Sequence, residues 1–110
     1  MAKSDYIVIF VTSDSYEEAL KIGKTLVEDE LVACANIIPQ IRSIFHWKGE
    51  VCDESEILLI MKSRAVLFEK IVDRVITLHS YDVPEIISLS ILSGSKDYLN
   101  WIAEVTKSEF

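Results

Sequence analysis

Ile41-Arg-Ser-Ile-Phe-His-Trp47, the turn Lys48-Gly49 and the returning segment Val51–Met61 form the stretch that decides the fold. The extended pattern of the first segment places Ile41, Ser43, Phe45 and Trp47 on one face. Lysine and glycine supply a two-residue turn, so the stretch predicts a long β-hairpin. A hairpin of this length projects beyond a small sheet, and uncovered Phe45 and Trp47 would promote aggregation. The stretch therefore also predicts that another copy of the chain packs on it, with Phe45 and Trp47 at the interface.

The segment before the hairpin predicts a strand, a helix and a second strand. Tyr6–Val11 is a continuous apolar, β-branched run, typical of a strand buried on both faces. Asp14, with Glu17 three residues later, predicts a capping box at the start of an amphipathic helix. Leu31–Ile38 predicts a strand that ends or bulges at Pro39, because proline lacks the backbone donor of a regular ladder.

The segment after the hairpin predicts a helix, a strand and a final helix. Ser63 is placed to cap the first of these helices, and Glu85–Leu92 predicts the strand. Ser95 can cap the last helix, on which Tyr98 and Trp101 share a face suited to core or interface packing. The apolar stripe of the first helix contains Leu67, Phe68, Ile71, Val75 and Leu78.

The predicted order is strand, helix, long hairpin, helix, strand, helix. With right-handed crossovers, two strand–helix units around a hairpin give one antiparallel sheet with the helices on one face. This is the split βαβ, ferredoxin-like arrangement of the α+β class. The chain of 110 residues has the size of one ordinary domain, and no linker, repeat or low-complexity segment divides it. We therefore expect a single domain over residues 1–110.

Composition limits the partners of the chain. Lys plus Arg number 11 and Asp plus Glu number 18, and the resulting charge of −7 argues against binding to nucleic acid or to an anionic membrane surface. The same charge is compatible with attraction of metal cations. Met1–Asp5 has no apolar region typical of a signal peptide, and no run approaches the roughly 20 apolar residues of a membrane span. Cys34 and Cys52 form no CxxC pair, so we expect reduced thiols in a cytoplasmic protein, with Cys34 buried.

The segment His79-Ser-Tyr-Asp-Val-Pro-Glu85 is the densest group of chemically active side chains. Imidazole is a common ligand of copper, zinc and nickel, and Asp82 or Glu85 could add oxygen ligands. The alternative is structural: His79 closes a helix, Pro84 directs the chain into a strand, and the carboxylates are solvated. From the residues alone the structural alternative is favoured.

Lys62 allows two interpretations. A lysine beside the free backbone N–H groups of a helix start at Ser63 could hold a small anion; alternatively Lys62 is a surface residue.

The chain has no Gly-rich phosphate loop, no GxSxG and no HExxH motif. A hydrolase that uses His79 with Asp82 or Glu85 as an acid–base pair is the least favoured alternative, because no nucleophile or oxyanion hole is evident. We therefore expect a protein that is not an enzyme and requires no cofactor.

Five segments in order resemble the CutA divalent-cation tolerance family, and the similarity runs from about Tyr6 to Ile102. The segments are Leu31-Val-Ala-Cys-Ala-Asn-Ile37, Trp47-Lys-Gly-Glu50, Leu58-Leu-Ile-Met-Lys-Ser63, His79-Ser-Tyr-Asp-Val-Pro-Glu-Ile86 and Tyr98-Leu-Asn-Trp101. The resemblance implies a ferredoxin-like subunit, a homotrimer similar in architecture to the PII signalling proteins, and a role in tolerance to copper and other divalent cations. The trimer would explain the long hairpin.

The resemblance also implies site residues. Some family members bind copper through a cysteine late in the first strand and two adjacent histidines; here Val11 and Leu78 stand at two of those positions, and His79 remains. A site for Cu²⁺ or another divalent cation would therefore combine His79 with Asp82 and Glu85. The residues expected around a cleft between subunits are Trp47, Lys62, Tyr81, Tyr98 and Trp101. The alternative function is a PII-like module that binds a small anionic metabolite there through Lys62 and the aromatic side chains.

Overall fold

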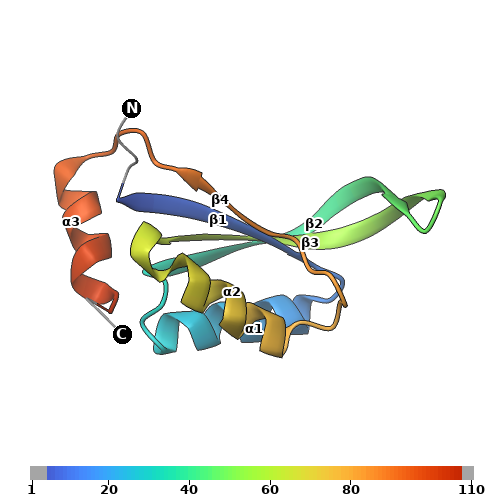
Figure 1. Cartoon of the computed structure of the whole chain (residues 1–110), viewed down its shortest axis with the longest axis horizontal. Helices are drawn as coiled ribbons and strands as arrows, with labels where there is room; N and C mark the ends of the chain where they lie inside the picture. The colour runs from blue at the N-terminus through green and yellow to red at the C-terminus, as the bar shows by residue number, and fades with distance from the viewer. Residues whose placement is uncertain (1–4, 108–110) are drawn as a thin grey trace.

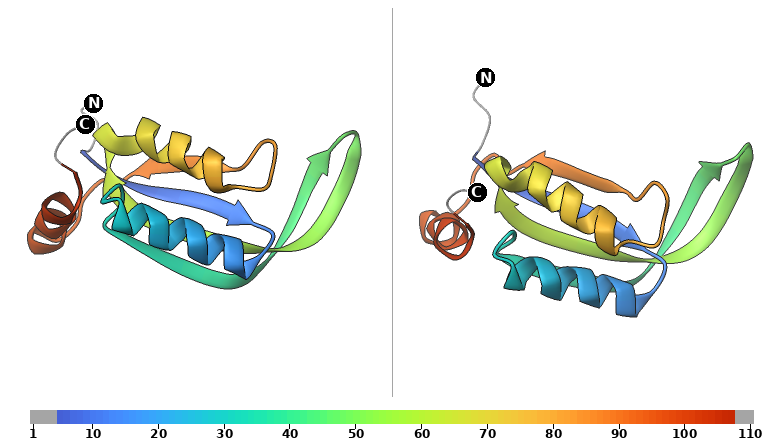
Figure 2. Two further views of the ribbon diagram at one scale, coloured as in Figure 1. Left: turned by 90° about the horizontal axis from the view of Figure 1, so that it is seen from below. Right: turned by 60° about the horizontal axis from the view of Figure 1, so that its bottom comes forward.

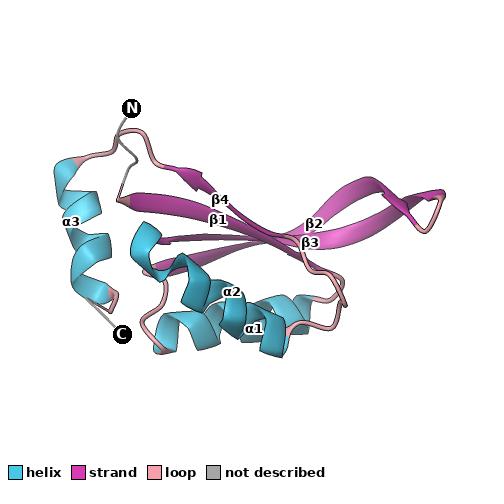
Figure 3. Cartoon of the chain, viewed as in Figure 1, coloured by secondary structure: helices cyan, strands magenta, loops and turns pink. Residues whose placement is uncertain are grey.

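The computed structural model describes residues 5–107, which fold as one four-stranded antiparallel sheet with three helices (Figures 1 and 3). The strand order is β2-β3-β1-β4, which is the predicted split βαβ arrangement followed by a final helix. The expectation for Met1–Asp5 concerns residues that lie, apart from Asp5, outside this range. In chain order the elements are β1 (Tyr6–Ser13), α1 (Tyr16–Glu28), β2 (Cys34–Trp47), β3 (Glu50–Arg64), the short 3-10 helix η1 (Ala65–Leu67), α2 (Phe68–Leu78), β4 (Ile86–Ser90) and α3 (Lys96–Val105).

The hydrophobic core lies between the sheet and the pair of helices α1 and α2, which run side by side below the sheet in Figure 1. Alternate residues of β1 and β3 point into it, because successive side chains of a strand face opposite sides. Gly23 allows α1 to approach β2, since a Cβ at this position would lie 3.1 Å from the Cβ of Ala35. The fully buried core side chains include Ile9, Val11, Ile22, Leu26, Leu59, Met61, Ile71 and Val75.

The opposite face of the sheet carries apolar side chains that no helix of the described chain covers. We call this surface the open face. Its members alternate with the core residues along each strand, and Ile38, Ile87 and Leu89 are exposed. Burial of such a surface requires a further layer.

Helix α3 departs from the prediction that all helices cover one face. It lies at the end of the sheet, beyond the start of β1, while only α1 and α2 cover a face (Figure 2). Ile102 is its fully buried residue, and the Oγ1 of Thr106 accepts a hydrogen bond from Nε of Arg64 at 3.0 Å. The prediction that α3 covers the same face of the sheet as the other helices was wrong, because an amphipathic pattern identifies which side of a helix is buried but not the surface on which it packs.

The hairpin formed by β2 and β3 extends well beyond the rest of the sheet, as predicted. Its register runs from Cys34↔Lys62 to Trp47↔Glu50, with a shift between Ile38 and Ile41 that confirms a bulge near Pro39. The chain therefore continues as one strand through this proline, which is tolerated because β2 is an edge strand. Lys48 and Gly49 both have positive φ, 49° and 81°, as a two-residue hairpin turn requires.

Three local predictions need correction. Ser15, not Asp14, caps α1, and its hydroxyl accepts a hydrogen bond from the backbone N–H of Glu18 at 3.1 Å. Ser63 does not start α2; it is buried in β3 and its hydroxyl donates to the carbonyl oxygen of Leu31. Ser95 precedes α3 as predicted, but its side chain makes no cap hydrogen bond.

The bounds of two strands differ from the prediction. β2 begins at Cys34 rather than at residue 31, because Leu31 and Val32 turn back onto the end of α1, where their N–H groups donate to the carbonyl of Leu26. β4 covers Ile86–Ser90 within the predicted Glu85–Leu92. Within residues 5–107, no helix is long and apolar enough to cross a membrane.

Candidate functional site

A groove of about 590 Å³ opens between the outer part of the hairpin and the loop of residues 79–85. Among residues 5–107, five carboxylates line the groove and no lysine, arginine or histidine does. The lining residues are Thr12, Asp14, Ser43, Ile44, Phe45, Trp47, Cys52, Glu54, Glu56, Tyr81, Asp82, Val83 and Glu85. A concave surface with charge of one sign raises the local concentration of oppositely charged ligands, so the groove favours cations.

The hairpin wall of the groove follows directly from strand register. Phe45 pairs with Cys52 and Ser43 pairs with Glu54, so these side chains project from the same face of the hairpin. Cys52, Glu54 and Glu56 occupy alternate positions of β3 and therefore share that face. The wall is thus acidic along β3 and aromatic along β2.

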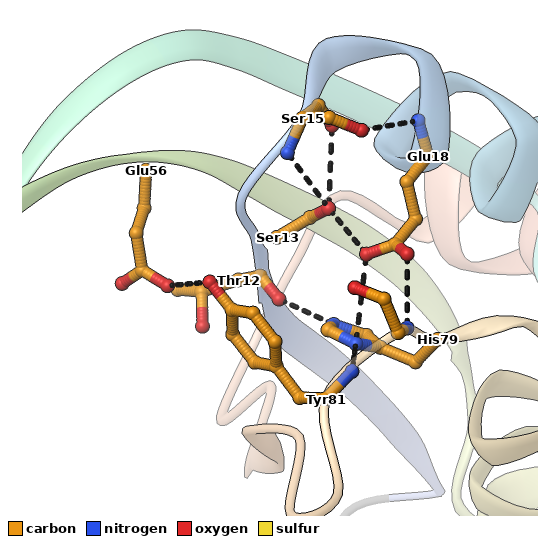
Figure 4. Close-up of polar contacts among 8 residues, drawn as sticks. Thr12, Ser13, Ser15, Glu18, Glu56, His79 and Tyr81 are labelled. Carbon is orange, nitrogen blue, oxygen red and sulfur yellow. Dashed lines mark hydrogen bonds and ion pairs between the residues drawn. The ribbon is translucent and has the colours of Figure 1, made fainter. Parts of the chain in front are cut away.

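The opposite wall is attached to the hairpin through one short hydrogen bond. The phenol of Tyr81 donates to Oε2 of Glu56 at 2.7 Å (Figure 4). Glu56 is only 7% exposed, so this bond supplies a donor to a largely buried carboxylate. Burial, together with the hydrogen bond and the negative charge of Glu56, raises the pKa of Tyr81 far above its ordinary value. The loop is therefore held against β3 by a phenol that stays protonated.

His79 lies beneath the same loop and is fully engaged in hydrogen bonds. Its Nε2 donates to the carbonyl oxygen of Thr12 at 2.6 Å, and its Nδ1 accepts from the N–H of Tyr81 at 3.1 Å. These partners correspond to the neutral ring protonated on Nε2. The side chain has no exposed surface, and its ring centroid lies 4.7 Å from that of Tyr81. His79 thus fixes the direction in which Tyr81 leaves the end of α2.

Glu18 supports this arrangement from α1. One of its oxygens accepts from the hydroxyl of Ser13 at 2.6 Å and the other from the N–H of Ser80 at 2.9 Å, while Nδ1 of His79 lies 3.5 Å away (Figure 4). Partial burial opposes the charged form, but the hydrogen bonds from Ser13 and Ser80 outweigh it and lower the pKa of Glu18. The loop is therefore anchored at two points, on α1 and on β3.

The structure separates the predicted metal ligands. Asp82 and Glu85 line the groove, whereas His79 lies behind Tyr81 and does not. Among the residues that the structure describes, no three His, Cys, Asp or Glu side chains converge in the manner of a preformed metal centre. A metal ion bound by all three predicted residues would require the His79 ring to leave its present partners. The assignment stays a prediction.

The residues predicted around a cleft fall into two groups within one chain. Trp47 and Tyr81 line the groove, whereas Lys62, Tyr98 and Trp101 lie toward the other end of the sheet. The ammonium of Lys62 donates to Oδ1 of Asn36 at 2.6 Å. The predicted helix start beside it is absent, because β3 continues to residue 64. Within one chain the two groups therefore do not form a common cleft.

Cys34 lies near Lys62, and it is half-buried rather than fully buried as predicted. Its sulfur is 3.7 Å from the hydroxyl of Tyr98, and this contact, followed by burial, raises the pKa of Tyr98. The rings of Tyr98 and Trp101 pack at 5.4 Å between centroids, as their shared helix face predicts.

Several groove residues were missed by the sequence prediction. Asp14 lies between β1 and α1, far along the chain from Glu54 and Glu56 on β3, and Glu18 was not recognised as a partner of His79. A usable signal was present in β3, where Cys52, Glu54 and Glu56 alternate opposite Phe45 and Ser43. The alternation predicts a polar face, but not the loop that closes it.

Known proteins resemble this chain closely. It is 46% identical over 99 residues to the "Divalent-cation tolerance protein CutA" of Thermus thermophilus, covering 90% of this chain and 96% of that protein. It is 42% identical to "Protein CutA, chloroplastic" of Arabidopsis thaliana, covering 93% of this chain but only 56% of the plant protein. The chain thus spans about half of that relative.

Solved structures agree with the sequence relatives. The "Divalent cation tolerance protein (Cut A1)" of Thermus thermophilus superposes with a TM-score of 0.91 at 44% identity, covering 93% of this chain and 99% of that one. The "Periplasmic divalent cation tolerance protein CutA" of Archaeoglobus fulgidus gives a TM-score of 0.90 at 38% identity, with coverages of 93% and 99%. The family described as "CutA1 divalent ion tolerance protein" matches residues 7–105. The chain therefore belongs to the CutA1 divalent ion tolerance family.

Proposed function

We propose that this protein is a non-catalytic homotrimer that takes part in divalent-cation tolerance, with the acidic groove as its cation-binding site. The observation that carries the proposal is the groove lining, to which the described part of the chain contributes five carboxylates and no cationic side chain. Copper or another divalent cation would be the bound species rather than a required cofactor. Asp82 and Glu85 are its proposed ligands, because both line the groove and both are exposed.

His79 can join Asp82 and Glu85 as a third ligand only if its ring leaves its present hydrogen-bond partners. In its present position the ring holds Tyr81 and Thr12, so coordination would exchange two hydrogen bonds for one metal bond. Copper accepts imidazole readily, which is the physical reason to retain His79 as a third ligand. The engaged ring also supports a binding role rather than catalysis, because it offers no free base to a substrate.

Calorimetric titration with Cu²⁺ tests the metal site. The double variant Asp82→Asn/Glu85→Gln is expected to weaken binding, whereas Glu28→Gln, an exposed carboxylate on α1 away from the groove, is expected to bind as the wild type does. Equal affinity of the double variant and the wild type would refute the groove as the site. His79→Ala, checked for folding by circular dichroism, removes His79 from the ligand set if it binds Cu²⁺ unchanged.

The homotrimer is proposed from the open face and the hairpin. Ile87 and Leu89 of β4 and Ile38 of β2 are exposed on the open face, which no helix within residues 5–107 covers, and Trp47 is exposed on the hairpin. Threefold association would bury these side chains and would bring Trp47 of one subunit near Lys62 or Tyr98 of another. Analytical ultracentrifugation of the wild type and Leu89→Lys tests this arrangement. A wild-type monomer at dilute concentration would refute it, and a dissociated variant would support it.

The alternative function, binding of a small anionic metabolite, has weaker physical support. The carboxylates of the groove repel anions from Trp47 and Tyr81, and the ammonium of Lys62 is already bound to Asn36. A cytoplasmic location remains part of our proposal. Fractionation of cells that express the full protein is the direct measurement.

A further inference from the structure

Lys62 is the one charged member of a row of side chains that crosses the open face. Its cross-strand neighbours are Cys34 on β2 and Val8 on β1, and Val8 in turn pairs with Leu89 on β4. Along β3, Lys62 alternates with the fully buried Met61 and therefore points away from the core. Any layer that covers the open face also covers this ammonium group.

The ammonium of Lys62 lacks a counter-charge in its own chain. Within residues 5–107 it donates to one acceptor, the neutral amide oxygen of Asn36 at 2.6 Å, although an ammonium group can donate three hydrogen bonds. No carboxylate of the same range lies within ion-pair distance of it. Removal of an unpaired charge from water is costly, so the layer that covers Lys62 is expected to bring a carboxylate.

The end of the hairpin offers such a carboxylate in Glu50. Glu50 pairs with Trp47 across the two strands, so both side chains project from one face of the hairpin. Both are exposed, and Glu50, unlike Glu54 and Glu56, does not line the groove of its own chain. In the proposed trimer, Trp47 of one subunit lies near Lys62 of another. Burial of Trp47 there brings the carboxylate of Glu50 to the uncompensated ammonium.

The hairpin is long enough to reach across a neighbouring sheet (Figure 1). The part of β3 from Glu56, where the loop is attached, to Glu50 spans about 20 Å at about 3.4 Å per residue. A four-stranded sheet with strands about 4.8 Å apart is about 14 Å wide. In a threefold ring every interface is heterologous, so the hairpin of each subunit meets a different surface of the next. Each subunit can thus give one carboxylate and receive another.

We propose that Glu50 of one subunit forms an ion pair with Lys62 of the next, and that this pair sets the register of the trimer. The inference rests on the proposed homotrimer and names the contact that selects its arrangement. Asn36 holds the ammonium in position, and the incoming carboxylate supplies the missing charge. An assembly in another register leaves the Lys62 charge buried without a partner, which disfavours that register.

Charge reversal and rescue test the inference. Assembly of the full chain is measured by sedimentation across a urea series, which gives a dissociation midpoint even for a tight trimer. Lys62→Glu and Glu50→Lys each bring like charges together, and each is expected to lower the midpoint by about 1 M or more. The double variant Lys62→Glu/Glu50→Lys is expected to regain most of this loss. Lys62→Glu/Glu54→Lys, with the same net charge but its second substitution in the groove, is the matched control and is expected not to recover.

The outcomes separate the ion pair from the homotrimer. A wild type that sediments as a monomer without urea refutes the trimer and the ion pair with it. A wild-type trimer in which Glu50→Lys does not rescue Lys62→Glu refutes the ion pair alone, as does equal rescue by Glu54→Lys. The neutral variants Lys62→Met and Glu50→Gln decide the case in which a reversed variant fails to fold by circular dichroism. Their effects on the midpoint are expected to be less than additive, and additive effects overturn the assignment.

Discussion

Tyr81→Phe removes a single hydroxyl from the contact that joins the loop to the hairpin. The lost bond is the 2.7 Å donation to Oε2 of Glu56, a residue that is 7% exposed. A hydrogen bond to a charged group contributes about 1.5–3 kcal/mol, and the loss of this donor to a largely buried carboxylate lies within that range. We expect the free energy of unfolding to fall by about 2 kcal/mol, which lowers the melting temperature by roughly 8 °C for a chain of this size.

The measurement is thermal and urea unfolding of wild type and variant at one protein concentration. Tyr16→Phe is the matched control, because it removes the hydroxyl of a tyrosine that is 49% exposed. Glu56→Gln completes a double-mutant cycle, in which the two single changes are expected to be less than additive. If Tyr81→Phe unfolds within about 0.5 kcal/mol of the wild type, the loop is not held in the manner described.

The same pair predicts the response to alkaline pH. Because burial and Glu56 raise the pKa of Tyr81, the folded protein retains the phenolic proton after the unfolded chain has lost it. The stabilisation that the protonated Tyr81 phenol provides is complete when the pH is below 10.0, the ordinary pKa of tyrosine, and it declines as the pH rises above that value. Wild type should therefore lose stability more steeply than Tyr81→Phe in this range, and parallel curves would contradict the assignment.

Three further outcomes follow from other contacts. The pKa of Glu18 is lowered from its ordinary value of 4.5, so the Glu18 carboxylate stabilises the fold above that pH and loses this effect as the pH falls. Glu18→Gln should therefore show a smaller acid-induced loss in urea midpoint than the wild type. Arg42→Ala removes an exposed ion pair with Asp53 and should leave the urea midpoint unchanged. Gly23→Val crowds Ala35, where even a Cβ would lie at 3.1 Å, and should reduce the free energy of unfolding by about 1–3 kcal/mol in the same assay; unchanged stability would show that α1 can shift.

Local sequence patterns predicted the elements well where one physical signal dominated. The run Tyr6–Val11 lies within β1, and the stripe from Leu67 to Leu78 is the face that α2 and η1 turn to the core. The hairpin followed from alternation and from Lys48-Gly49, which takes the positive φ angles of its turn. The capping position was missed by one residue because Asp14 and Ser15 are both good caps, and local sequence does not choose between them.

The site was predictable only in part because its walls meet through tertiary structure. Asp82 and Glu85 were identified from one short segment, and both line the groove. Their partners Glu54 and Glu56 stand on the distant hairpin, so their proximity depends on strand register and on the path of the loop. His79 illustrates a different point: the residues alone favoured a structural role and the family resemblance suggested a ligand, and the structure commits both ring nitrogens to hydrogen bonds, in agreement with the structural interpretation.

The continuity of β2 and β3 from the sheet to the turn has a consequence for adaptation. One side of the groove is an extension of the same backbone ladder that builds the interior, so it is stiff and costly to remodel. The other side is a short irregular crossover restrained by a few side chains. Substitutions at Asp82 or Val83, which line the groove, change its chemistry with little penalty to folding, so selection can alter this groove from one side only.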